Sequence, residues 1–557
     1  MPHPDPAIFF HPDAIESVGK GVVGRRSAGQ SFLKGWLAHC GAERLSLVTE
    51  HANASRELEK LLREMGETRP LDIRTLRGPT DFTAFGTIFF PAPGYMNAAW
   101  RRQHFAPQAC SLVGITHTVS TRRVMEGLHN LLAEPVEPWD ALICTSRAVQ
   151  SVVRRQFDLE AEYYRQRFGA SRVPMPRLPL IPLGVNAADF TRDDRARAGF
   201  RQRYDVSEDG FVVLSMGRLT SVEKANMVPL LQVLERMSGK IGRPIHFWMA
   251  GWASRDTEKA LHERAAKDVA PNVTVRIIDG QDPDVRRRIW SAADVFSLPV
   301  DNIQETFGLV PVEAMAAGLP VVMPDWNGFR DTVLHDETGF LIPTRMAPPG
   351  YGTRVAERFA EGTDDYLRHL SVVQQHTAID QGAYEAALTA LAGDEGLRRQ
   401  MGAAAVRHVK QRFDWSAVIP QYLALADDLA ERRKGAHPTT PKLASGPAGP
   451  LEVDPFDLYS DYPTDVLKPT DVVRLVSPID RAAMDALDEV NGRKLYKRKI
   501  ISDDVLQAVQ AVLSQSGPME VSTLAGRLRV PLTGVIPACL LLAKFGALAL
   551  PETSPRP

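Results

Sequence analysis

The sequence of 557 residues predicts an α/β protein with two Rossmann-like domains that face a cleft, followed by a small α-rich module. Short apolar runs alternate with longer amphipathic segments, which is the pattern of a parallel sheet with crossover helices. This alternation occurs twice, with a break near residue 185. The chain is also too long for one compact core. Ligands of such sheets bind beyond the carboxyl ends of the strands, so we expect the binding site in the cleft.

The first series predicts an N-terminal domain over residues 1–185. Helical patterns such as SAGQSFLKGWLAHC and SRELEKLLREMG separate its apolar runs, and RLPLIPLG (177–184) closes this half. The predicted strands are 7–10, 44–49, 71–76, 87–91, 111–116 and 141–146. His117 follows one of them directly and should face the cleft.

The second series predicts a domain over residues 186–433, and the mostly helical segment 380–433 should end it. Its predicted strands are 211–217, 245–251, 273–279, 294–300, 319–325 and 339–344. The junction between the two domains falls at IPLGVN (181–186).

Composition excludes several classes of protein. Hydrophobic content of 44% and charged content of 24% are ordinary for a globular protein, and the net charge of −1 offers no global attraction to nucleic acid or anionic membrane. We find neither a signal-peptide pattern nor an apolar run of ~18 residues, so a cytoplasmic location is expected. The cysteines match no zinc or redox spacing and should be reduced, buried thiols: Cys40, Cys110, Cys144 and Cys539.

Residues 434–470 are rich in Pro and Gly and predict a linker or an extended surface segment before a module at 471–557. Within 519–550, a helix, a turn, a second helix and a glycine turn into an apolar strand resemble a winged helix. The candidate recognition helix, roughly 532–544, is almost wholly apolar, with Lys544 alone at its end.

Because a recognition helix needs polar and basic residues facing the groove, this module favours protein–protein contact or homo-oligomerisation over nucleic acid binding. A nearby basic cluster could touch phosphate or make a peripheral membrane contact, although such clusters more often form a solvated basic face. It consists of Arg493, Lys494, Lys497, Arg498 and Lys499.

The stretch LPVDNIQETFGLVPVEAMAAGLP (298–320) predicts a short helix whose amino end is open to a ligand. Pro311 suits the first turn, and Gly318 with Pro320 ends the helix, so it should span roughly 310–317. Gly308 would let the backbone approach a ligand closely at the positive end of the helix dipole.

Two carboxylates flank this helix start. Glu313, expected in the first turn, and Glu305, in the preceding loop, could each accept hydrogen bonds from hydroxyls, and the amides of Thr306 to Leu309 could face an anion. An isolated pair of glutamates is more often structural. Here GRLTSVEK (217–224) adds Arg218 and Lys224 after another strand end, and these cations suit a diphosphate. Together they predict a sugar-nucleotide site.

These motifs resemble retaining glycosyltransferase family 4, which has the two-Rossmann GT-B architecture. The two glutamates stand in ETFGLVPVEAMAAGLPVV with seven residues between them. Further matches are GRLTSVEK, IPLGVN, AADVF (292–296), DETGFLIP (336–343) and RFDW (412–415). The resemblance covers about residues 1–433 and is stronger in the second domain.

The resemblance implies a role for each matched residue. Glu305, with the amides of Phe307 and Gly308, would hold the donor hexose, and Glu313 would bind the ribose. The catalytic set would comprise Glu305, His117 beside the donor sugar, and the two cations at the diphosphate, Arg218 and Lys224. The substrate-binding set would be Gly24, Thr306, Phe307, Gly308, Leu309 and Glu313. Gly24 would let its loop approach the phosphates.

The family's usual proposal is front-face displacement, in which a leaving-group phosphate oxygen accepts the acceptor's proton. Electrostatic stabilisation of the departing diphosphate would then supply much of the catalysis. The resemblance implies a nucleotide-diphosphate sugar as co-substrate and an acceptor as partner, with no cofactor and no metal.

Two short patterns match a metal motif and a cofactor motif, but their positions favour ordinary local structure. Asp282-Pro283-Asp284 matches an Asp-x-Asp metal motif, but it precedes a helical run and predicts a helix cap. Arg286 to Arg288 then lie on a solvated face. GKGVVG (19–24) matches G-x-G-x-x-G, yet several residues separate it from the strand at 7–10, which argues against a dinucleotide site.

Two departures from the family pattern concern the donor sugar and the rim of the site. The family's Gly-Gly-x-x-Glu turn is replaced by DWNGFRD, which supplies Asn327 and Asp331. Residues 345–375 resemble an insertion near the rim.

The sequence therefore predicts a metal-independent, retaining transferase that moves a hexose to an acceptor held by the first domain. An epimerase or phosphorylase on the same architecture is the alternative among enzymes. The alternative from another class is a catalytically degenerate sugar-nucleotide-binding regulatory or scaffold protein that acts through its C-terminal module. The donor base, the hexose and the acceptor leave no decisive side-chain pattern.

Overall fold

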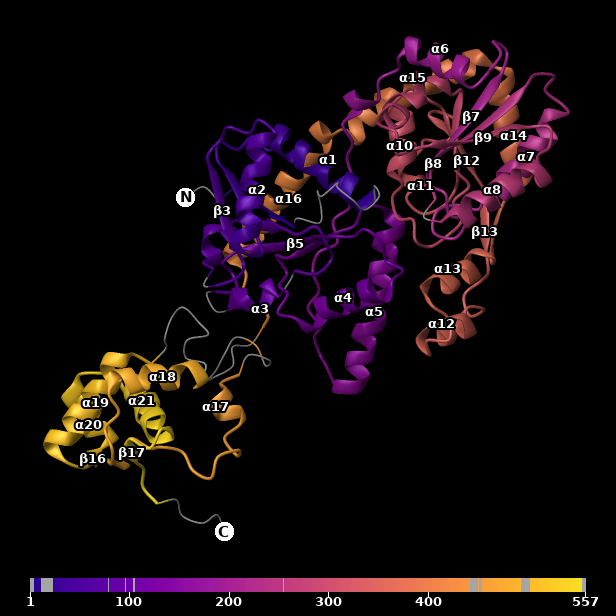
Figure 1. Ribbon diagram of the computed structural model, residues 1–557. Helices are drawn as coiled ribbons and strands as arrows, with labels where there is room; N and C mark the ends of the chain where they lie inside the picture. The colour runs from indigo at the N-terminus through magenta and orange to yellow at the C-terminus, as the bar shows by residue number, and fades with distance from the viewer. Residues whose placement is uncertain are drawn as a thin grey trace. The chain divides into compact units, whose positions relative to one another are not determined.

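The computed structural model describes residues 5–11, 24–78, 80–95, 97–103, 106–253, 255–440, 449, 453–491 and 501–552 (Figure 1). The chain forms two compact units, Met1–Ala444 and Ser445–Pro557.

The first unit begins with a parallel sheet of six strands in the order β3-β2-β1-β4-β5-β6. All six strands predicted for the first domain are present. They are β1 (Ala7–Phe10), β2 (Leu45–Thr49), β3 (Leu71–Thr75), β4 (Thr87–Phe89), β5 (Ser111–Ile115) and β6 (Ala141–Ile143). The crossover helices are α1 (Gly24–His39), α2 (Ala52–Glu64), α3 (Ala98–Gln103), α4 (Arg122–Ala133) and α5 (Arg147–Phe168).

A second parallel sheet of six strands follows, in the order β12-β11-β10-β7-β8-β9. Its strands are β7 (Phe211–Arg218), β8 (Ile245–Trp252), β9 (Thr274–Asp279), β10 (Val295–Ser297), β11 (Val321–Pro324) and β12 (Gly339–Ile342). Its main helices are α6 (Asp194–Arg203), α7 (Val228–Ser238), α8 (Asp256–Val269), α9 (Pro283–Arg288), α10 (Leu309–Ala316), α14 (Gln381–Gly393) and α15 (Glu395–Arg412).

The two sheets have the same connectivity. In each, the first strand lies in the middle, three consecutive strands extend the sheet to one side, and the next three extend it to the other side. The predicted fold class, two Rossmann-like domains in a GT-B arrangement with an added helical module, is confirmed. The point at which the strand order reverses places a ligand crevice beyond the carboxyl ends of β7 and β10 and of β1 and β4. Their side chains are apolar on both faces because helices cover both sides of each sheet.

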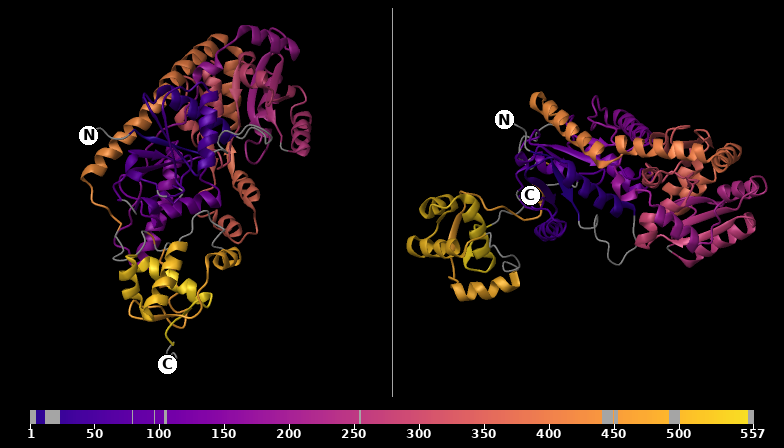
Figure 2. Two further views of the ribbon diagram at one scale, coloured as in Figure 1. Left: turned by 60° about the vertical axis from the view of Figure 1, so that its left-hand side comes forward. Right: turned by 90° about the horizontal axis from the view of Figure 1, so that it is seen from above.

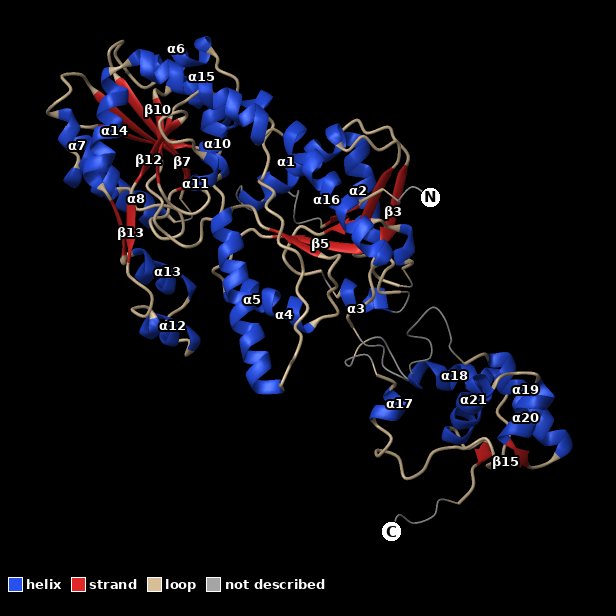
Figure 3. Cartoon of the chain, turned by 180° about the vertical axis from the view of Figure 1, so that it is seen from behind, coloured by secondary structure: helices blue, strands red, loops and turns tan. Residues whose placement is uncertain are grey.

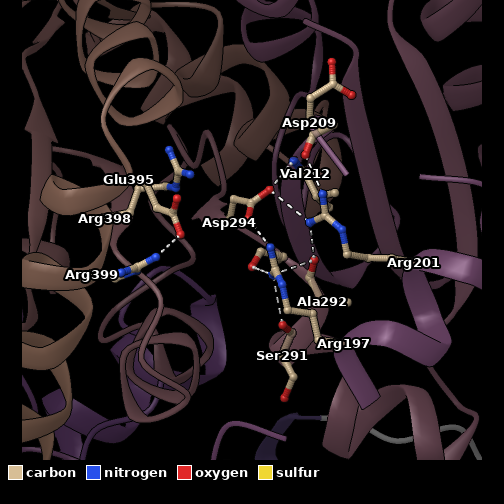
Figure 4. A network of polar contacts seen from close by, with 12 residues as sticks. Arg197, Arg201, Asp209, Val212, Ser291, Ala292, Asp294, Glu395, Arg398 and Arg399 are labelled. Carbon is tan, nitrogen blue, oxygen red and sulfur yellow. Dashed lines mark hydrogen bonds and ion pairs between the residues drawn. The ribbon is translucent and has the colours of Figure 1, made fainter. Parts of the chain in front are cut away.

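A polar network anchors α6 at the amino end of the second sheet (Figure 4). Asp294, which directly precedes β10, accepts hydrogen bonds from Arg197 Nη2 at 2.8 Å, Arg201 Nη1 at 3.3 Å and the amide of Val212 at 2.8 Å. These partners compensate the charge of a buried carboxylate. The network therefore ties a helix to the sheet edge that faces away from the carboxyl ends.

Helix α16 (Trp415–Gly435) corrects the predicted domain boundary. The sequence assigned residues up to 433 to the second domain, but α16 packs on the first sheet and shares its core (Figure 2). The ring of Tyr422 lies 5.3 Å from that of Phe89, and the ring of Trp415 lies 5.6 Å from that of Phe32. An amphipathic pattern shows which face of a helix is buried but not which sheet will cover it.

Two glycines make room for the indole of Trp415. A Cβ at Gly35 would lie 2.3 Å from this ring, and one at Gly184 would lie 2.5 Å from it. Gly184 belongs to the predicted domain junction IPLGVN, where the amide of Val185 also donates to the carbonyl of Phe413 at 2.8 Å. The crossing from α15 to α16 is thereby fixed against the junction.

The start of the predicted linker is held on the first domain. Glu137, which is buried, accepts hydrogen bonds from the amide of Thr439 at 2.8 Å and from the amide of Thr440 at 3.2 Å. Residues 439–440 therefore belong to the surface of the first unit, which corrects the predicted boundary at 434. A later part of the segment forms the short helix α17 (Pro455–Leu458).

The predicted insertion forms an arm on the second domain (Figure 3). Strands β13 (Thr344–Met346) and β14 (Thr377–Ile379) pair antiparallel at its base. Helices α12 (Thr353–Ala360) and α13 (Tyr366–Gln374) lie between them in the chain. We call residues 344–379 the arm.

The second unit has its own core. Its helices are α18 (Arg481–Asn491), α19 (Asp503–Ser516), α20 (Val521–Leu528) and α21 (Leu532–Lys544). A three-stranded antiparallel sheet joins β16 (Met519–Glu520), β15 (Val472–Leu475) and β17 (Leu548–Ala549). The basic cluster at 493–499 lies outside the described residues. The winged-helix assignment stays a prediction.

The predictions on the cysteines and on membrane-spanning helices can be compared with the structure. All four cysteines are free and buried, as the sequence predicts. Within the described part of the chain, no single helix is long and apolar enough to cross a bilayer; only α20 and α21 together, bent by 116°, meet that criterion. Helix α21 turns Val535, Ala538 and Leu542 into the core of its own unit.

Truncating Trp415 tests the packing of α16. Trp415→Ala should lower the free energy of unfolding by about 3–5 kcal/mol, because a large buried ring is lost and the two glycines beside it cannot fill the space. Urea titration followed by circular dichroism measures the change. Asp427→Ala, on the exposed side of the same helix, should change stability by less than about 0.5 kcal/mol. Equal effects of the two variants would contradict this packing.

Candidate sugar-nucleotide site

The predicted residues of the second domain gather at the carboxyl end of its sheet. Arg218 is the last residue of β7, and the loop that follows carries Lys224. Helix α10 begins at Leu309, one residue earlier than predicted, with Gly308 as its N-cap. Glu313 consequently lies just beyond the first turn and not within it.

The loop before α10 is built around Gly308. Its φ is +84°, and a Cβ there would lie 2.2 Å from the ring of Phe329. The backbone of Gly328 also packs directly against this loop, since a Cβ there would lie 2.5 Å from the Cα of Phe307. The side chain of Phe307 is buried and packs 6.0 Å from the ring of Phe413. Phe307 therefore anchors the loop with its ring and offers the site its backbone amide.

Lys224 and Glu305 form an ion pair, with Nζ 2.9 Å from Oε2. Burial raises the pKa of Glu305, but the charge and hydrogen bond of Lys224 and the backbone amides of Thr306 and Phe307 outweigh it, so the pKa lies below its ordinary value. Glu305 is thus ionised at neutral pH. The sequence assigned these two residues to different parts of the donor, and the structure brings them into contact.

Arg218 is also paired. Its Nη1 lies 3.3 Å from Oε1 of Glu223, a residue that sequence reasoning missed. A carboxylate five residues after an arginine in a loop carries no distinctive signal. Both cations predicted for the diphosphate therefore have a carboxylate partner in the structure.

Glu313 differs from Glu305 in its surroundings. It is half-buried, and among the described residues its carboxyl has neither a hydrogen-bond nor an ion-pair partner. Burial raises its pKa to about 7, although the charges of Lys224 and Arg286 act in the opposite direction. The carboxyl can accept a hydrogen bond from a ligand without losing a contact within the protein.

His117 follows β5 as predicted and lies against the second domain. Its Nε2 is 2.6 Å from the carbonyl oxygen of Pro91, which can only accept, so this nitrogen carries the proton. The hydroxyl of Thr306 donates to the carbonyl oxygen of His117. The histidine after β5 and the loop before α10 are therefore joined directly.

Two further contacts join the domains at the same place. The hydroxyl of Ser146 donates to the carbonyl of Thr306 at 2.8 Å. Asp331 accepts from the amide of Arg147 at 2.7 Å and from its Nε at 2.5 Å. Asp331, one of the two departures from the family pattern, thus serves domain contact.

Asn327, the other departure, supports Glu305. Its Nδ2 donates to the carbonyl of Glu305 at 3.0 Å, and its φ of +39° places it in a conformation that asparagine tolerates better than most residues. Its Oδ1 is buried and, among the described residues, has no hydrogen-bond partner. An unsatisfied buried acceptor next to Glu305 is suited to a ligand hydroxyl.

Asn302 connects the loop that carries Lys224 to the loop before α10, and it was not predicted. Its Nδ2 donates to the carbonyl of Lys224 at 2.8 Å, and its Oδ1 accepts from the amide of Glu305 at 3.2 Å. Trp326 Nε1 donates to the carbonyl of Asn302 at 2.8 Å. Asn302 therefore positions both members of the ion pair through their backbone atoms. No sequence motif indicates this role, because the contacts depend on how the two loops fold together.

Two further predicted features lie at the starts of α9 and α1. Asp282 caps α9 by accepting from the amide of Asp284 at 2.9 Å, as expected. Gly24 is the first residue of α1, but residues 12–23 lie outside the described part, so the approach of this loop to a phosphate stays a prediction. In the described ranges, no group of three or more His, Cys, Asp or Glu is arranged to hold a metal ion.

Two of the cavities in the first unit differ in their relation to the predicted site residues. One of about 700 Å³ lies at the amino end of the second sheet, near Asp294, and contains none of the predicted site residues. The other, of about 100 Å³, has a mostly apolar lining that includes Phe10, Phe32, Ile115 and His117. The smaller cavity therefore adjoins the predicted acceptor side.

Comparison with known proteins agrees with this geometry. Residues 210–359, in the second domain, match the family model described as "Glycosyl transferases group 1". The D-inositol 3-phosphate glycosyltransferase of Xylanimonas cellulosilytica is 28% identical over 310 residues, which cover 53% of this chain and 58% of that protein.

Other similar proteins are more distant or match over a shorter length. The GDP-mannose-dependent alpha-(1-6)-phosphatidylinositol monomannoside mannosyltransferase of Mycobacterium tuberculosis is 30% identical over 223 residues, which cover 38% of this chain and 55% of that one. A solved glycosyltransferase from Rickettsia africae has 13% identity and a TM-score of 0.48, over 76% of this chain and 98% of its own. The chain spans about half the length of the curated relatives it matches.

The pKa of Glu313 leads to a stability prediction. Because the folded value of about 7 lies above the ordinary 4.5, the folded chain holds this proton more tightly than the unfolded chain does. The wild type should lose stability as pH rises from about 4.5 to 7, relative to Glu313→Gln. At pH 8 the variant should be more stable by roughly 3 kcal/mol, and below pH 4.5 the difference should vanish.

Thermal melts at pH 4, 6 and 8 without ligand measure this difference. Glu337→Gln, which changes a carboxyl outside the site, serves as the control for the charge change. A stability difference between wild type and Glu313→Gln that stays constant across these pH values would contradict the elevated pKa.

Proposed function

We propose that the chain is a metal-independent, retaining glycosyltransferase that moves a hexose from a nucleotide-diphosphate sugar to an acceptor on the first domain. The observation that carries the proposal is the Lys224–Glu305 pair, which stands at the carboxyl end of the second sheet before the amino end of α10. The group 1 glycosyl transferase match over 210–359 supports the same activity.

Donor binding would proceed by an exchange of ionic partners. A diphosphate draws Lys224 and Arg218 away from Glu305 and Glu223, because a phosphate group offers several anionic oxygens to each cation. Glu305, released from the ammonium group, then accepts hydrogen bonds from hexose hydroxyls. Before the exchange each cation compensates a carboxylate, and afterwards both cations compensate the diphosphate. Hydrogen bonds from the hexose hydroxyls then replace the ammonium group as the partner of Glu305.

Two acceptor groups that have no hydrogen-bond partner among the described residues would complete the donor site. Glu313 would accept from the ribose hydroxyls, and the buried Oδ1 of Asn327 would accept from a hexose hydroxyl. The amides of Phe307 to Leu309, at the positive end of α10, would face the sugar and the phosphate nearest to it.

The chemical step would be a front-face displacement. The bond between the anomeric carbon and the phosphate oxygen breaks, the acceptor oxygen bonds to the same face, and a phosphate oxygen takes the acceptor's proton. Arg218 and Lys224 stabilise the negative charge that develops on the leaving diphosphate. The role of His117 would be to position the acceptor beside the donor sugar.

We also infer that residues 471–557 form a winged-helix-like module for protein contact. Most of the apolar side chains of helix α21 pack into the core of the second unit. Its single basic residue, Lys544, lies at its carboxyl end. This composition suits a protein partner or a second copy better than the phosphate backbone of a nucleic acid.

A panel of UDP-, GDP- and ADP-sugars tests the donor class. The true donor should raise the melting temperature in proportion to RT ln(1 + [L]/Kd), because it binds only the folded state. Differential scanning fluorimetry measures the shift. If none of the three classes stabilises the chain at millimolar concentration, the sugar-nucleotide assignment is wrong.

Arg218→Ala separates an active transferase from a degenerate binding protein. Its kcat should fall about 10²–10³-fold, because one donor of transition-state stabilisation is lost, while Kd for the donor changes less. Release of nucleotide diphosphate measures turnover, and calorimetry measures binding. Arg407→Ala, at an exposed position on α15, should behave as wild type. Binding without turnover in the wild type would favour the regulatory alternative.

A further inference from the structure

The arm places one tyrosine between the two domains. Tyr366 begins α13 and is half-buried, and its hydroxyl lies 2.8 Å from Oγ of Ser120 in the first domain. The same hydroxyl donates to Oε1 of Gln304 in the second domain at 3.0 Å. The arm therefore contacts both sides of the site through a single group.

These contacts belong to a longer chain of hydrogen bonds. Gln304 Nε2 donates to the carbonyl of Glu223 at 2.9 Å, which leaves its Oε1 as the acceptor for Tyr366. Because the tyrosine proton is used there, Ser120 must donate to Tyr366. Thr118, whose Oγ1 lies 3.1 Å from Oγ of Ser120, then donates to Ser120. In this series of hydrogen bonds, every donor therefore points from the first domain towards the second.

Both ends of this chain adjoin the proposed reaction centre. Thr118 directly follows His117 on the acceptor side. Gln304 directly precedes Glu305, and the carbonyl at the far end belongs to Glu223, whose carboxylate pairs with Arg218.

A second contact fixes the other end of α13. Gln374, the last residue of the helix, is 8% exposed, and its Nε2 donates to the carbonyl of Ser221 at 3.0 Å and to Oδ1 of Asp301 at 2.5 Å. Ser221 lies in the loop that carries Lys224. Helix α13 is thereby held at both ends against the donor-side loops, so Tyr366 cannot move freely away from its partners.

We propose that Tyr366 is a positioning residue that couples the acceptor-side loop, residues 117–120, to the donor-side loop, residues 301–305. This role rests on the proposed transferase function. The hydroxyl keeps the two loops in one fixed relation when donor and acceptor are bound. Phosphate and ribose contacts do not pass through it, so binding of a nucleoside diphosphate should be independent of Tyr366.

Tyr366→Phe in the full-length chain tests this coupling. With the nucleotide sugar of the UDP, GDP and ADP panel that stabilises the wild type, kcat for sugar release or transfer should fall about 10–100-fold, because small misplacements of reacting groups are costly. The Kd of the corresponding nucleoside diphosphate should stay within about twofold. Tyr351→Phe, at a position on the same arm that is 77% exposed, should match the wild type.

A double-mutant cycle with Ser120→Ala distinguishes the hydroxyl contact from a general loosening of the arm. If the shared hydrogen bond carries the effect, the double variant should be no slower than Tyr366→Phe alone. Fully additive losses, or a Tyr366→Phe variant with wild-type kcat, would overturn the proposal. A loss of nucleotide affinity equal to the loss in kcat would also overturn it, since the arm would then be only structural.

Amide hydrogen exchange provides a readout that needs no turnover. In Tyr366→Phe, exchange should rise together in residues 117–120 and 301–305 and stay unchanged in β13 and β14. Unchanged exchange in the two loops would refute the coupling. Absence of binding and turnover in the wild type would refute the transferase function instead, so the two failures are distinguishable.

Discussion

The backbone of residues 305–309 is the constraint on which the rest of the site depends. Gly308 can take its left-handed conformation, and Gly328 can lie against Phe307, only because neither carries a Cβ. Packed in this way, the loop leads directly into α10, and the side chain of Glu305 at its start is 17% exposed. Thr306 at its centre contacts the first domain through both its hydroxyl and its carbonyl. A shift of this loop would therefore disturb the donor site and the domain contact together.

The charges of the site are arranged so that each cation has a carboxylate partner before a ligand arrives. Lys224 holds Glu305 in its ionised form, and Arg218 pairs with Glu223. Such pairing compensates the half-buried carboxylates in a low-dielectric environment. Glu313 is the exception, because burial without a partner raises its pKa to about 7. Its ionisation is thus a cost to the folded chain that a bound diol would offset.

Contact between the domains is distributed over several elements. Asp331 reaches Arg147 at the start of α5, Thr306 reaches His117 after β5, and the arm reaches Ser120 through Tyr366. Helix α16 adds a fourth connection by crossing back to cover the first sheet. The departure from the family pattern at Asp331 and the insertion at 345–375 both bring a side chain of the second domain into contact with the first domain.

The sequence by itself determined the twelve strands, the fold class and the position of α10 to within one residue, because apolar periodicity, Pro311 and Gly318 act locally. It also indicated which charged residues gather at the strand ends. Only the tertiary structure decided that Lys224 pairs with Glu305, that α16 belongs to the first sheet and that Tyr366 meets Ser120. These partners are separated by many residues, in the last case by 246, and they meet only once both sheets have formed. Contacts at such separation leave no local pattern, because complementary shape and charge select them after folding has brought the elements together.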